Sequence, residues 1–563
     1  MKRLYSLAKQ WRFDVLALLI LGSVVFLLVQ PMRANEGMWR IFDDVHIARS
    51  EAVLGELRAG QFPVRMIQTF GNGGGYPLFN YYSPLTYYLT AFLIAIGTHP
   101  LNSVKLVFQA AYALFALGMF FYLRGGLQLS RKAALVGAIT AISSAYFNYD
   151  SYTRGALAEL LGFAMLPWVL GFFELLLKHK KWYFVFGSAG MLSILFLFHA
   201  ITGIIAVLML TVVIGVRTLI SSERRTENIW LTFVTFALCG LVSAWYLIPV
   251  VLEKKYVRYS IVEFVQTGYK DAALSLREVL GFTSINPEIK PVTLGLGISI
   301  LVAMSAVVLL KKYQKLKRPS AHFFNENKVV LSYGAGILTT LFLLSQSSWF
   351  LWERSSVLQA LQFPYRFLSF LTCASIAFIL ITRKRSLSKW YRALVLVALI
   401  AASYQTKYFA QPSGYYFSDR FAAEDSCTTT SWQKEYLPVE TSECIIKDSI
   451  PLVTASGGVE VLSKQDFASG DILVETGGSE GELRFAKYYF PGWNVYIDEK
   501  LSTPYPTTEH GLLTIMVPEG SHTVRAVYGK TLVQSVSEVI SLVTLLALAG
   551  YTVIQIAVVL KEK

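Results

Sequence analysis

The feature that most constrains the fold of this chain is a series of long apolar runs separated by polar turns. A helix of about 20 apolar residues is long enough to cross the hydrocarbon core of a bilayer. Runs of that length, or close to it, occupy residues 13–30, 103–123, 133–148, 155–177, 183–198, 200–217, 229–251, 292–311, 329–346, 366–382, 391–404 and 539–560. Because 54% of the residues are hydrophobic and only 16% are charged, a soluble fold could not bury the apolar surface. The pattern predicts a polytopic α-helical membrane protein with about 12 spans.

The placement of lysine and arginine predicts how these spans are oriented. Basic clusters occupy five short loops, at 124–132, 178–181, 217–225, 311–318 and 383–389. If a further apolar run, 84–98, lies flat on the membrane, all five clusters and both termini fall on the cytoplasmic side, where such residues are enriched. The first extracytoplasmic loop is then 31–102. The net charge of +14 fits contact with anionic lipid of the bilayer, and no motif for nucleic acid is present.

The segment 405–535 differs in character from the rest of the chain. Its Gly, Pro, Thr and Ser residues separate short alternating apolar runs, at 471–475, 512–517 and 522–528. Such alternation is typical of antiparallel strands with one buried face. We therefore expect a transmembrane module over 1–404, an extracytoplasmic β-sandwich over 405–535, and a final helix with a cytoplasmic tail over 536–563.

The cysteines fall into two pairs. Cys239 and Cys373 lie in apolar runs and are expected to be small core residues. Cys427 and Cys444 lie in the β-rich segment and can pair if that segment is extracytoplasmic.

On this topology, polar residues gather at the extracytoplasmic ends of the spans. The first loop opens on two adjacent carboxylates, and the short second loop carries another acid close to an arginine. The candidate residues are the acids Asp43, Asp44, Asp150 and Glu159, the cations Arg154, Lys254, Arg258 and Arg366, and the histidines His46 and His199. A carboxylate near cations at one membrane face suits the transfer of a sugar from a lipid phosphate.

The two residue types have distinct roles in such a transfer. A carboxylate takes the proton of an acceptor hydroxyl as that hydroxyl attacks the anomeric carbon. Cations hold the lipid phosphate and stabilise it as the leaving group. We assign Asp43, Asp44 and Asp150 to catalysis, Arg154, Arg366, His199, Lys254 and Arg258 to the donor phosphate, and His46 and Glu159 to support. The membrane delivers the donor laterally, and the glycine-rich run 71–75 lacks the Lys-Ser/Thr ending of a phosphate loop, so we interpret it as a turn.

Each candidate also has a simpler structural interpretation. The Asp43-Asp44 pair can cap the N-terminus of the helix expected at 43–59, where carboxylates accept amide hydrogen bonds. Glu159 lies just inside the fourth span and needs a partner, which Arg154 is near enough to supply. Asp150 can belong to an ordinary polar turn, and His199 can be a satisfied polar residue at a helix break. Arg366 can be an interfacial anchor at the outer end of a span.

The long first loop with its acidic pair, the short second loop with Asp150 and the basic cytoplasmic turns resemble the GT-C superfamily of integral-membrane glycosyltransferases. These enzymes use polyprenyl-phosphate or polyprenyl-diphosphate sugars. The Asp43-Asp44 pair resembles the acidic pair of protein mannosyltransferases and aminoarabinose transferases, in which a first-loop Asp is implicated in catalysis. The resemblance implies Asp43 as the first choice of base, with Asp44 standing where several of these families have Glu. Metal use varies across the superfamily, so Mg²⁺ or Mn²⁺ is an optional cofactor.

Further segments, at 75–84, 152–159, 361–366 and 488–498, resemble the bacterial YfhO-type and 6-pyruvoyl-tetrahydropterin synthase-related membrane proteins. The last of them, with 518–524, is similar to the C-terminal β-domain of the YfhO type. The resemblance implies glycosylation of a cell-envelope glycan or polymer at the outer face of a bacterial cytoplasmic membrane. The implied donor is an undecaprenyl-phosphate sugar. No zinc-binding histidine cluster accompanies the pterin name, so no pterin chemistry is implied.

Two other function classes compete with the glycosyltransferase. A transporter or flippase of lipid-linked glycans could use the same basic residues without chemistry, but it would more naturally show midplane charges and two similar halves. A non-catalytic envelope protein could bind polysaccharide through the β-domain while the acidic pair only caps a helix. Mutation of Asp43 and Asp44 separates this last class from the first.

Overall fold

The computed structural model describes residues 2–221, 225–258, 274–281, 292–315, 321–383, 408–416, 435–441, 450–467, 469–508 and 510–561. The chain forms two compact units. The first comprises Met1–Asp44, Val104–Gly240 and Val262–Phe417, and the second comprises Val45–Ser103, Leu241–Ile261 and Ser418–Lys563. The predicted span 391–404 and the cysteines Cys427 and Cys444 lie outside the described residues.

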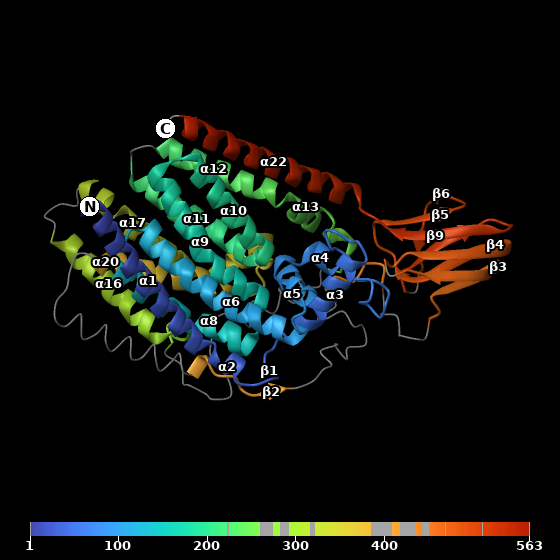
Figure 1. Cartoon of the computed structure of the whole chain (residues 1–563), viewed down its shortest axis with the longest axis horizontal. Coiled ribbons are helices and arrows are strands. Elements are labelled where there is room, and N and C mark those ends of the chain that lie inside the picture. Colours follow the sequence, from blue (N-terminus) through green and yellow to red (C-terminus); the bar gives the residue numbers. More distant parts are fainter. Residues whose placement is uncertain are drawn as a thin grey trace. The chain divides into compact units, whose positions relative to one another are not determined.

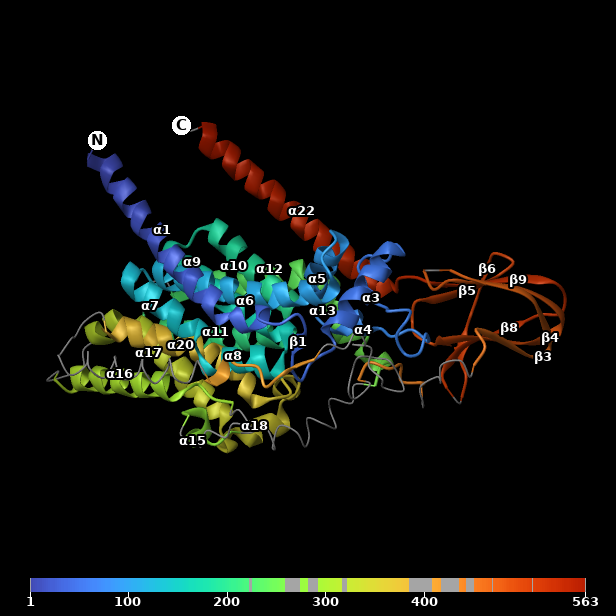
Figure 2. The same ribbon diagram turned by 60° about the horizontal axis from the view of Figure 1, so that its bottom comes forward.

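The first unit is a bundle of apolar helices (Figure 1). Its long helices are α1 (Lys2–Leu28), α6 (Pro100–Phe121), α7 (Arg131–Ile142), α9 (Leu157–His179), α10 (Trp182–Phe198), α11 (Ala200–Ile220), α12 (Arg225–Val242), α16 (Leu296–Gln314), α17 (Ala321–Leu344) and α20 (Leu368–Arg383). Short helices are α2 (Gln30–Arg33), η1 (Tyr122–Gly126), α8 (Ala145–Tyr149), η2 (Asp150–Arg154), α15 (Leu276–Val279), η4 (Gln346–Ser348), α18 (Trp349–Arg354), α19 (Ser356–Gln359) and η5 (Pro364–Phe367). Helices α9, α10 and α11 pack in sequence, α11 packs on α17, and α17 on α20 (Figure 2).

Helix lengths agree with most of the predicted spans. Among the described residues, seven helices are long and apolar enough to cross a bilayer, and eight if α12 and α13 (Ala244–Leu252) count as one bent span. Helices α1 and α10 coincide with predicted spans but are shorter in their described apolar part. The prediction of about 12 spans is therefore not settled by length and composition, and it stays a prediction.

The predicted span at 133–148 differs most from the structure. It is divided into α7 and α8 because Ser144 adopts an extended conformation, with ψ of 146°. Serine is a weaker helix former than alanine or leucine, so a break at the Ser143-Ser144 pair agrees with helix propensity, although the Ser144 side chain makes no cap hydrogen bond. Helix α7 has 12 residues and a length of about 18 Å, which is shorter than the hydrocarbon core.

The second unit begins with the helices of the predicted first loop, α3 (His46–Arg58), α4 (Leu78–Tyr81) and α5 (Leu85–Ala95). Helix α5 covers most of the run 84–98 and has 11 residues, a length of about 16 Å that is too short to cross a bilayer. The unit also contains α13, η3 (Lys254–Tyr256) and α22 (Leu532–Lys561).

The β-domain of the second unit is a seven-stranded antiparallel sheet (Figure 1). Its strands are β3 (Val453–Asp466), β4 (Ile472–Tyr488), β5 (Trp493–Ile497), β6 (Lys500–Ser502), β7 (Tyr505–Pro506), β8 (Leu512–Val517) and β9 (His522–Tyr528). The order is β6-β5-β9-β4-β8-β7, with β3 paired to β4. Strands β8 and β9 begin and end at the residues that the alternating pattern predicts.

One long strand gives this sheet its sandwich-like packing. The first part of β4 pairs with β9, and its last part pairs with β8. Strand β3 pairs with β4 along most of its length, with register shifts near Gly457. Ile472 and Phe485, from the two parts of β4, belong to one buried core with Val524 of β9. The two halves of a single folded sheet therefore enclose the core that the sequence pattern predicts.

The glycine-rich run 71–75 is a turn, as expected. Gly71 has a φ of +66°, and a Cβ at Gly74 would lie 2.6 Å from the ring of Tyr488. The Tyr488 N–H donates to the carbonyl of Gly74 at 2.7 Å, and Lys487 Nζ donates to that of Gly73 at 3.0 Å. The turn therefore packs against the end of β4 and has a structural role.

Candidate active site

The first-loop acids lie where the chain leaves α2 and a short strand, β1 (Met38–Trp39), which pairs with β2 (Tyr415–Tyr416). The N–H of Asp43 donates to the carbonyl of Arg154 at 2.9 Å, and the N–H of Phe42 donates to the carbonyl of Thr153 at 3.1 Å. These bonds attach the start of the first loop to η2, the predicted second loop. The structure thus brings Asp43 beside the Asp150–Arg154 segment, which sequence reasoning placed only at the same membrane face.

A glycine makes this approach possible. Gly155 follows η2 in the left-handed region, with a φ of +72°. A Cβ at this position would lie 2.4 Å from the Cβ of Ile41. Only glycine combines this backbone conformation with room for Ile41. The close contact holds the 41–43 segment at the beginning of α9.

Glu159, in the first turn of α9, is the centre of a buried charge network. Its Oε2 accepts hydrogen bonds from Arg154 Nη1 at 2.5 Å and from Arg366 Nε at 2.9 Å. Its Oε1 accepts from the hydroxyl of Tyr146 at 2.6 Å. The expected Arg154–Glu159 pair is therefore present, and the same carboxylate also holds the second candidate arginine.

The two arginines differ in how much of their hydrogen-bonding capacity is used. Arg366 Nη1 also donates to the carbonyl of Leu361 at 2.8 Å and to Gln362 Oε1 at 2.6 Å. The Arg154 side chain is 13% exposed, against 6% for Arg366. Within the described part of the chain, no hydrogen bond is made by Arg154 Nε or Nη2, or by Arg366 Nη2. These atoms remain as donors for an anionic ligand.

Asp150 is fully buried beside Arg154. Its Oδ1 lies 3.3 Å from Arg154 Nη1, and its Oδ2 has no hydrogen-bond partner among the described residues. Burial raises the pKa of Asp150 well above its ordinary value, the charges of Glu159 and Asp43 add to this effect, and Arg154 opposes it. The carboxyl group is therefore poised to carry a proton more readily than an exposed aspartate.

Aromatic rings cover the arginines. Phe363 and Tyr365, just before Arg366, stack with ring centroids 5.1 Å apart. The Arg154 guanidinium carbon lies 5.7 Å from the Tyr365 ring, and that of Arg366 lies 5.1 Å from the Phe363 ring. These distances are in the cation–π range. Sequence reasoning missed Tyr146 and Tyr365 as members of the site, although Tyr365 adjoins a candidate and Tyr146 lies one helical turn before Asp150.

Asp44 does not make the helix cap that was the alternative interpretation of the acidic pair. Val45 occupies the cap position of α3, and no side-chain hydrogen bond caps this helix. Although much of the Asp44 side chain is exposed, desolvation by surrounding atoms raises its pKa, and the neighbouring Asp43 charge adds to the shift. Asp43 is half-buried and attached to η2, so its position is better defined.

His199 caps a helix at the same end of the bundle. It lies between α10 and α11, and its Nδ1 accepts a hydrogen bond from the N–H of Thr202 at 3.3 Å. The Thr202 hydroxyl lies 2.8 Å from the same nitrogen. This is the satisfied residue at a helix break that the sequence analysis left as an alternative.

The other three candidates belong to the second unit. His46 begins α3, and its Nδ1 lies 3.0 Å from the hydroxyl of Tyr87, with which its ring stacks. Lys254 and Arg258 are exposed near η3, and the Arg258 N–H donates to the carbonyl of Leu437 at 2.7 Å. The structure thus gathers Asp43, Asp44, Asp150, Arg154, Glu159, His199 and Arg366 in one unit and these three residues in the other.

The described residues do not fit a divalent metal. Among them, no group of three or more His, Cys, Asp or Glu side chains is arranged to hold an ion. Near the site, the Glu159 carboxylate is occupied by two guanidiniums and a phenol. We therefore derive no step through Mg²⁺ or Mn²⁺.

A bundle of apolar helices with a buried carboxylate–arginine network, in a chain that also carries an antiparallel β-domain, defines a multi-pass membrane protein. Residues 79–411 match the 6-pyruvoyl-tetrahydropterin synthase related domain, a membrane-protein family. This match covers more than half of the chain, and the chain belongs to this family. No curated protein matches it.

Three solved structures are similar to the chain at low identity. The arabinofuranosyltransferase AftD from Mycobacteria has 15% identity and a TM-score of 0.45, over 71% of this chain and 27% of its own. The Archaeoglobus fulgidus oligosaccharyltransferase has 14% identity and a TM-score of 0.44, over 78% of this chain and 61% of its own. ArnT from Cupriavidus metallidurans, bound to undecaprenyl phosphate, has 12% identity and a TM-score of 0.30, over 67% and 78%.

The chain spans less than two thirds of the length of the first two of these proteins. Because all three TM-scores lie below 0.5, we draw no functional conclusion from the likenesses.

Proposed function

We propose that this protein is a membrane glycosyltransferase that moves a sugar from a polyprenyl-phosphate donor to a cell-envelope glycan or polymer. The observation that carries the proposal is the hydrogen bond from the Asp43 N–H to the carbonyl of Arg154. It holds the Asp43 main chain against that of Arg154, whose guanidinium retains free donors, and the Asp43 charge interacts with that guanidinium. A base and an anion-binding group side by side are what an attack on a phosphate-activated sugar requires.

Asp43 acts as the base in this reaction. An acceptor hydroxyl oxygen forms a bond to the anomeric carbon while its proton passes to the Asp43 carboxylate. The bond between the anomeric carbon and the phosphate oxygen breaks, and its electron pair leaves with the polyprenyl phosphate. Attack opposite the leaving group inverts the configuration of the sugar. Asp44 is the second choice of base, because it is exposed and less firmly placed.

Arg154 binds the departing phosphate. Its Nε and Nη2 atoms are the free donors, and a planar guanidinium can hold two phosphate oxygens at once. Arg366 contributes its positive charge from a more buried position. Glu159 is a positioning residue, because it fixes both guanidiniums and compensates part of their charge.

The site is proposed to face the outside of a bacterial cytoplasmic membrane. Asp150, Glu159, His199 and Arg366 lie at the N-terminal ends of α9, α11 and α20. The basic clusters lie at the opposite ends of the same helices, and clusters of this kind favour the cytoplasm. A polyprenyl-phosphate donor would then reach the site laterally, within the outer half of the bilayer.

A second candidate function is a non-catalytic envelope protein. The observation that favours it is the double hydrogen bond of Glu159, which gives both arginines a partner without any ligand. In that case the network only stabilises the junction of η2, α9 and η5. The unused donors of Arg154 and the absence of a side-chain cap on α3 favour the enzyme.

Complementation of a deletion strain tests the choice between these functions. The strain would carry the wild type, Asp43→Asn, Asp44→Asn or the control Asp466→Asn, which changes an exposed carboxylate on β3. Mass spectrometry of the envelope glycans at matched protein levels is the measurement. We expect one sugar to be lost with Asp43→Asn and kept with Asp466→Asn. Unchanged glycans with both first-loop variants would contradict the proposal.

A further inference from the structure

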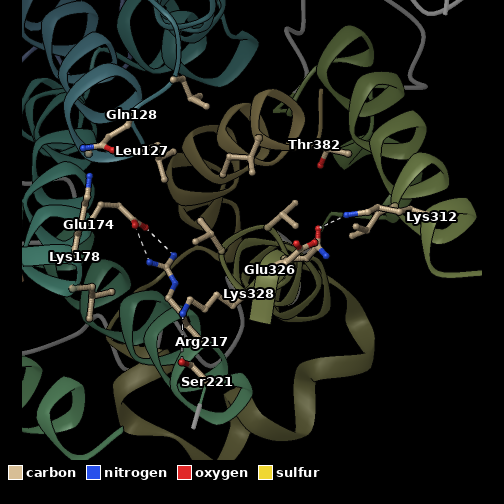
Figure 3. A pocket seen from close by; sticks show the side chains of 18 of the residues that line it. Leu127, Gln128, Glu174, Lys178, Arg217, Ser221, Lys312, Glu326, Lys328 and Thr382 are labelled. Atoms are coloured by element: carbon tan, nitrogen blue, oxygen red, sulfur yellow. Dashed lines mark hydrogen bonds and ion pairs between the residues drawn. The ribbon is translucent and has the colours of Figure 1, made fainter. Parts of the chain in front are cut away.

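A second polar region lies at the other end of the helices that form the candidate active site. A cavity of about 940 Å³ lies between the last turns of α9, α11, α16 and α20 and the first turns of α17 (Figure 3). All of these elements belong to the first unit. The cavity is therefore separated from the Asp43 site by the length of the spanning helices.

The cavity has an excess of positive charge. Seven basic side chains and two carboxylates line it. One carboxylate, Glu174, accepts two hydrogen bonds from Arg217, at 2.7 and 2.8 Å (Figure 3). It also accepts one from the Tyr333 hydroxyl at 2.6 Å. The other, Glu326, lies 3.1 Å from His322 Nε2. The carboxylates of the cavity therefore leave most of its cations uncompensated.

Lys180 pairs with Glu227 at 2.9 Å, and the other five lysines supply the remaining charge. Within the described residues, no carboxylate lies at ion-pair distance from Lys178, Lys311, Lys312, Lys315 or Lys328. Lys312 Nζ donates to Asn327 Oδ1 at 3.2 Å and Lys328 Nζ to Ser221 Oγ at 3.4 Å, so both contact neutral groups (Figure 3). A group of like charges around one cavity favours an anionic occupant.

Part of the remaining wall of the cavity is apolar. Leu177, Leu309 and Ile381, from three different helices, are among its lining residues. A free phosphate ion would leave this wall and most of the volume uncovered, whereas an amphiphile would match both parts. The volume is near the upper end of the range for small-molecule sites.

We propose that this cavity binds an anionic phospholipid, with the headgroup phosphate among the lysines and the first part of an acyl chain against the apolar wall. Described residues of four predicted cytoplasmic loops, 124–132, 178–181, 217–225 and 311–318, line the cavity, and the cytoplasmic leaflet carries anionic lipids. This inference does not depend on the proposed glycosyltransferase activity. The single negative charge of the lipid phosphate would offset part of the charge of these lysines, and the bound lipid would join the ends of α16, α17 and α20.

Lipid titration of two matched double variants tests the inference. Lys311→Gln/Lys315→Gln removes two exposed lysines of the cavity. The control Lys132→Gln/Lys181→Gln removes two exposed lysines of the predicted cytoplasmic loops that do not line it. Purified, delipidated full-length protein would be titrated with dioleoylphosphatidylglycerol or dioleoylphosphatidylcholine in a non-ionic detergent, and bound lipid counted by native mass spectrometry.

We expect wild-type protein to bind phosphatidylglycerol more tightly than phosphatidylcholine. The cavity variant should lose affinity for phosphatidylglycerol by about fivefold for each lysine removed. The control variant should bind it as the wild type does. Equal binding by the two variants, or equal binding of the two lipids, would overturn the proposal. Displacement of phosphatidylglycerol by millimolar inorganic phosphate would overturn it in favour of a free phosphate site.

Discussion

The main-chain N–H of Asp43 lies 2.9 Å from the carbonyl oxygen of Arg154 and donates a hydrogen bond to it. This bond joins the beginning of the first loop to the second loop, and it places a carboxylate near a buried charge network. Backbone hydrogen bonds of this kind fix a residue's position whatever its side chain. An Asp43→Asn variant should therefore keep the geometry of the site and change only its charge.

The contact between Gly155 and Ile41 should be essential for that geometry. Gly155→Ala places a Cβ 2.4 Å from the Ile41 Cβ at a φ of +72°, so the first loop must shift. We expect a loss of stability of about 1–3 kcal/mol and a loss of activity close to that of Asp43→Asn. Gly190→Ala, in α10, is the control, because a Cβ there meets nothing within 4 Å. Equal activity of the two variants in the complementation assay would contradict this interpretation.

Loss of the Glu159 charge should destabilise the first unit. Glu159→Gln keeps the shape of the side chain but removes the negative charge that now lies 2.5 Å from Arg154 Nη1 and 2.9 Å from Arg366 Nε. Both guanidiniums then lose their shared carboxylate partner. Removing one partner of a buried ion pair costs about 3 kcal/mol or more. Thermal unfolding in detergent should show a clearly lower midpoint than that of Glu480→Gln, which changes an exposed carboxylate. Equal unfolding midpoints for Glu159→Gln and Glu480→Gln would mean that the ion pairs of Glu159 do not stabilise the folded state.

Some of these contacts follow from the sequence, and others do not. The pairing of Arg154 with Glu159 was predictable because the two residues are five positions apart, one just before α9 and the other in its first turn. The pairing of Arg366 with the same carboxylate joins residues separated by 207 positions, and no local pattern contains that information. The role of Tyr146 was hidden for a different reason. Its segment is apolar enough to predict an unbroken span, whereas the structure has a break at Ser144.

The β-domain was more accessible to prediction, since alternation reports directly which face of a strand is buried. The alternating pattern predicts strands at 512–517 and 522–528, and these are the bounds of β8 and β9. The pairing of β4 with both of them is a long-range property, and the alternating pattern does not encode it.

The two arginines should respond differently to replacement by lysine. Arg154→Lys keeps a positive charge beside Glu159 but removes the free Nε and Nη2 donors, so kcat/KM should fall by about 10-fold to 100-fold with little loss of stability. Arg366→Lys also breaks the bonds to Leu361 and Gln362, so its unfolding midpoint should fall more. Unfolding midpoints and initial transfer rates of both variants would be measured side by side. Identical effects of the two substitutions would contradict the assignment of Arg154 to the phosphate.

Glu56 should make the second unit less stable as the pH rises. Burial raises the pKa of this α3 carboxyl group from 4.5 to about 7, against the opposing effects of the Gln68 N–H at 2.6 Å and the Lys487 charge. The folded state then holds a proton that the unfolded state releases. This contribution, about 3 kcal/mol, is fully present below pH 4.5 and is lost as the pH passes 7.

Glu56→Gln should remove this dependence. Between pH 5 and pH 8, the unfolding midpoint of the wild type should fall relative to that of Glu56→Gln. The control Glu51→Gln, which changes an exposed position on the same helix, should follow the wild type. Parallel pH profiles for all three proteins would show that Glu56 does not titrate in this range.

The most direct test of the proposed activity is discharge of the lipid-linked donor by purified protein. Polyprenyl-phosphate sugars extracted from the deletion strain would be incubated with envelope glycan and wild-type, Asp43→Asn or Asp466→Asn protein in proteoliposomes. Transfer of sugar from the lipid to the glycan fraction is the measurement. Wild type and Asp466→Asn should discharge the lipid, and Asp43→Asn should be slower by about 100-fold or more, because it lacks the base. Equal rates for wild type and Asp43→Asn, or no discharge by wild type, would contradict a glycosyltransferase with Asp43 as its base.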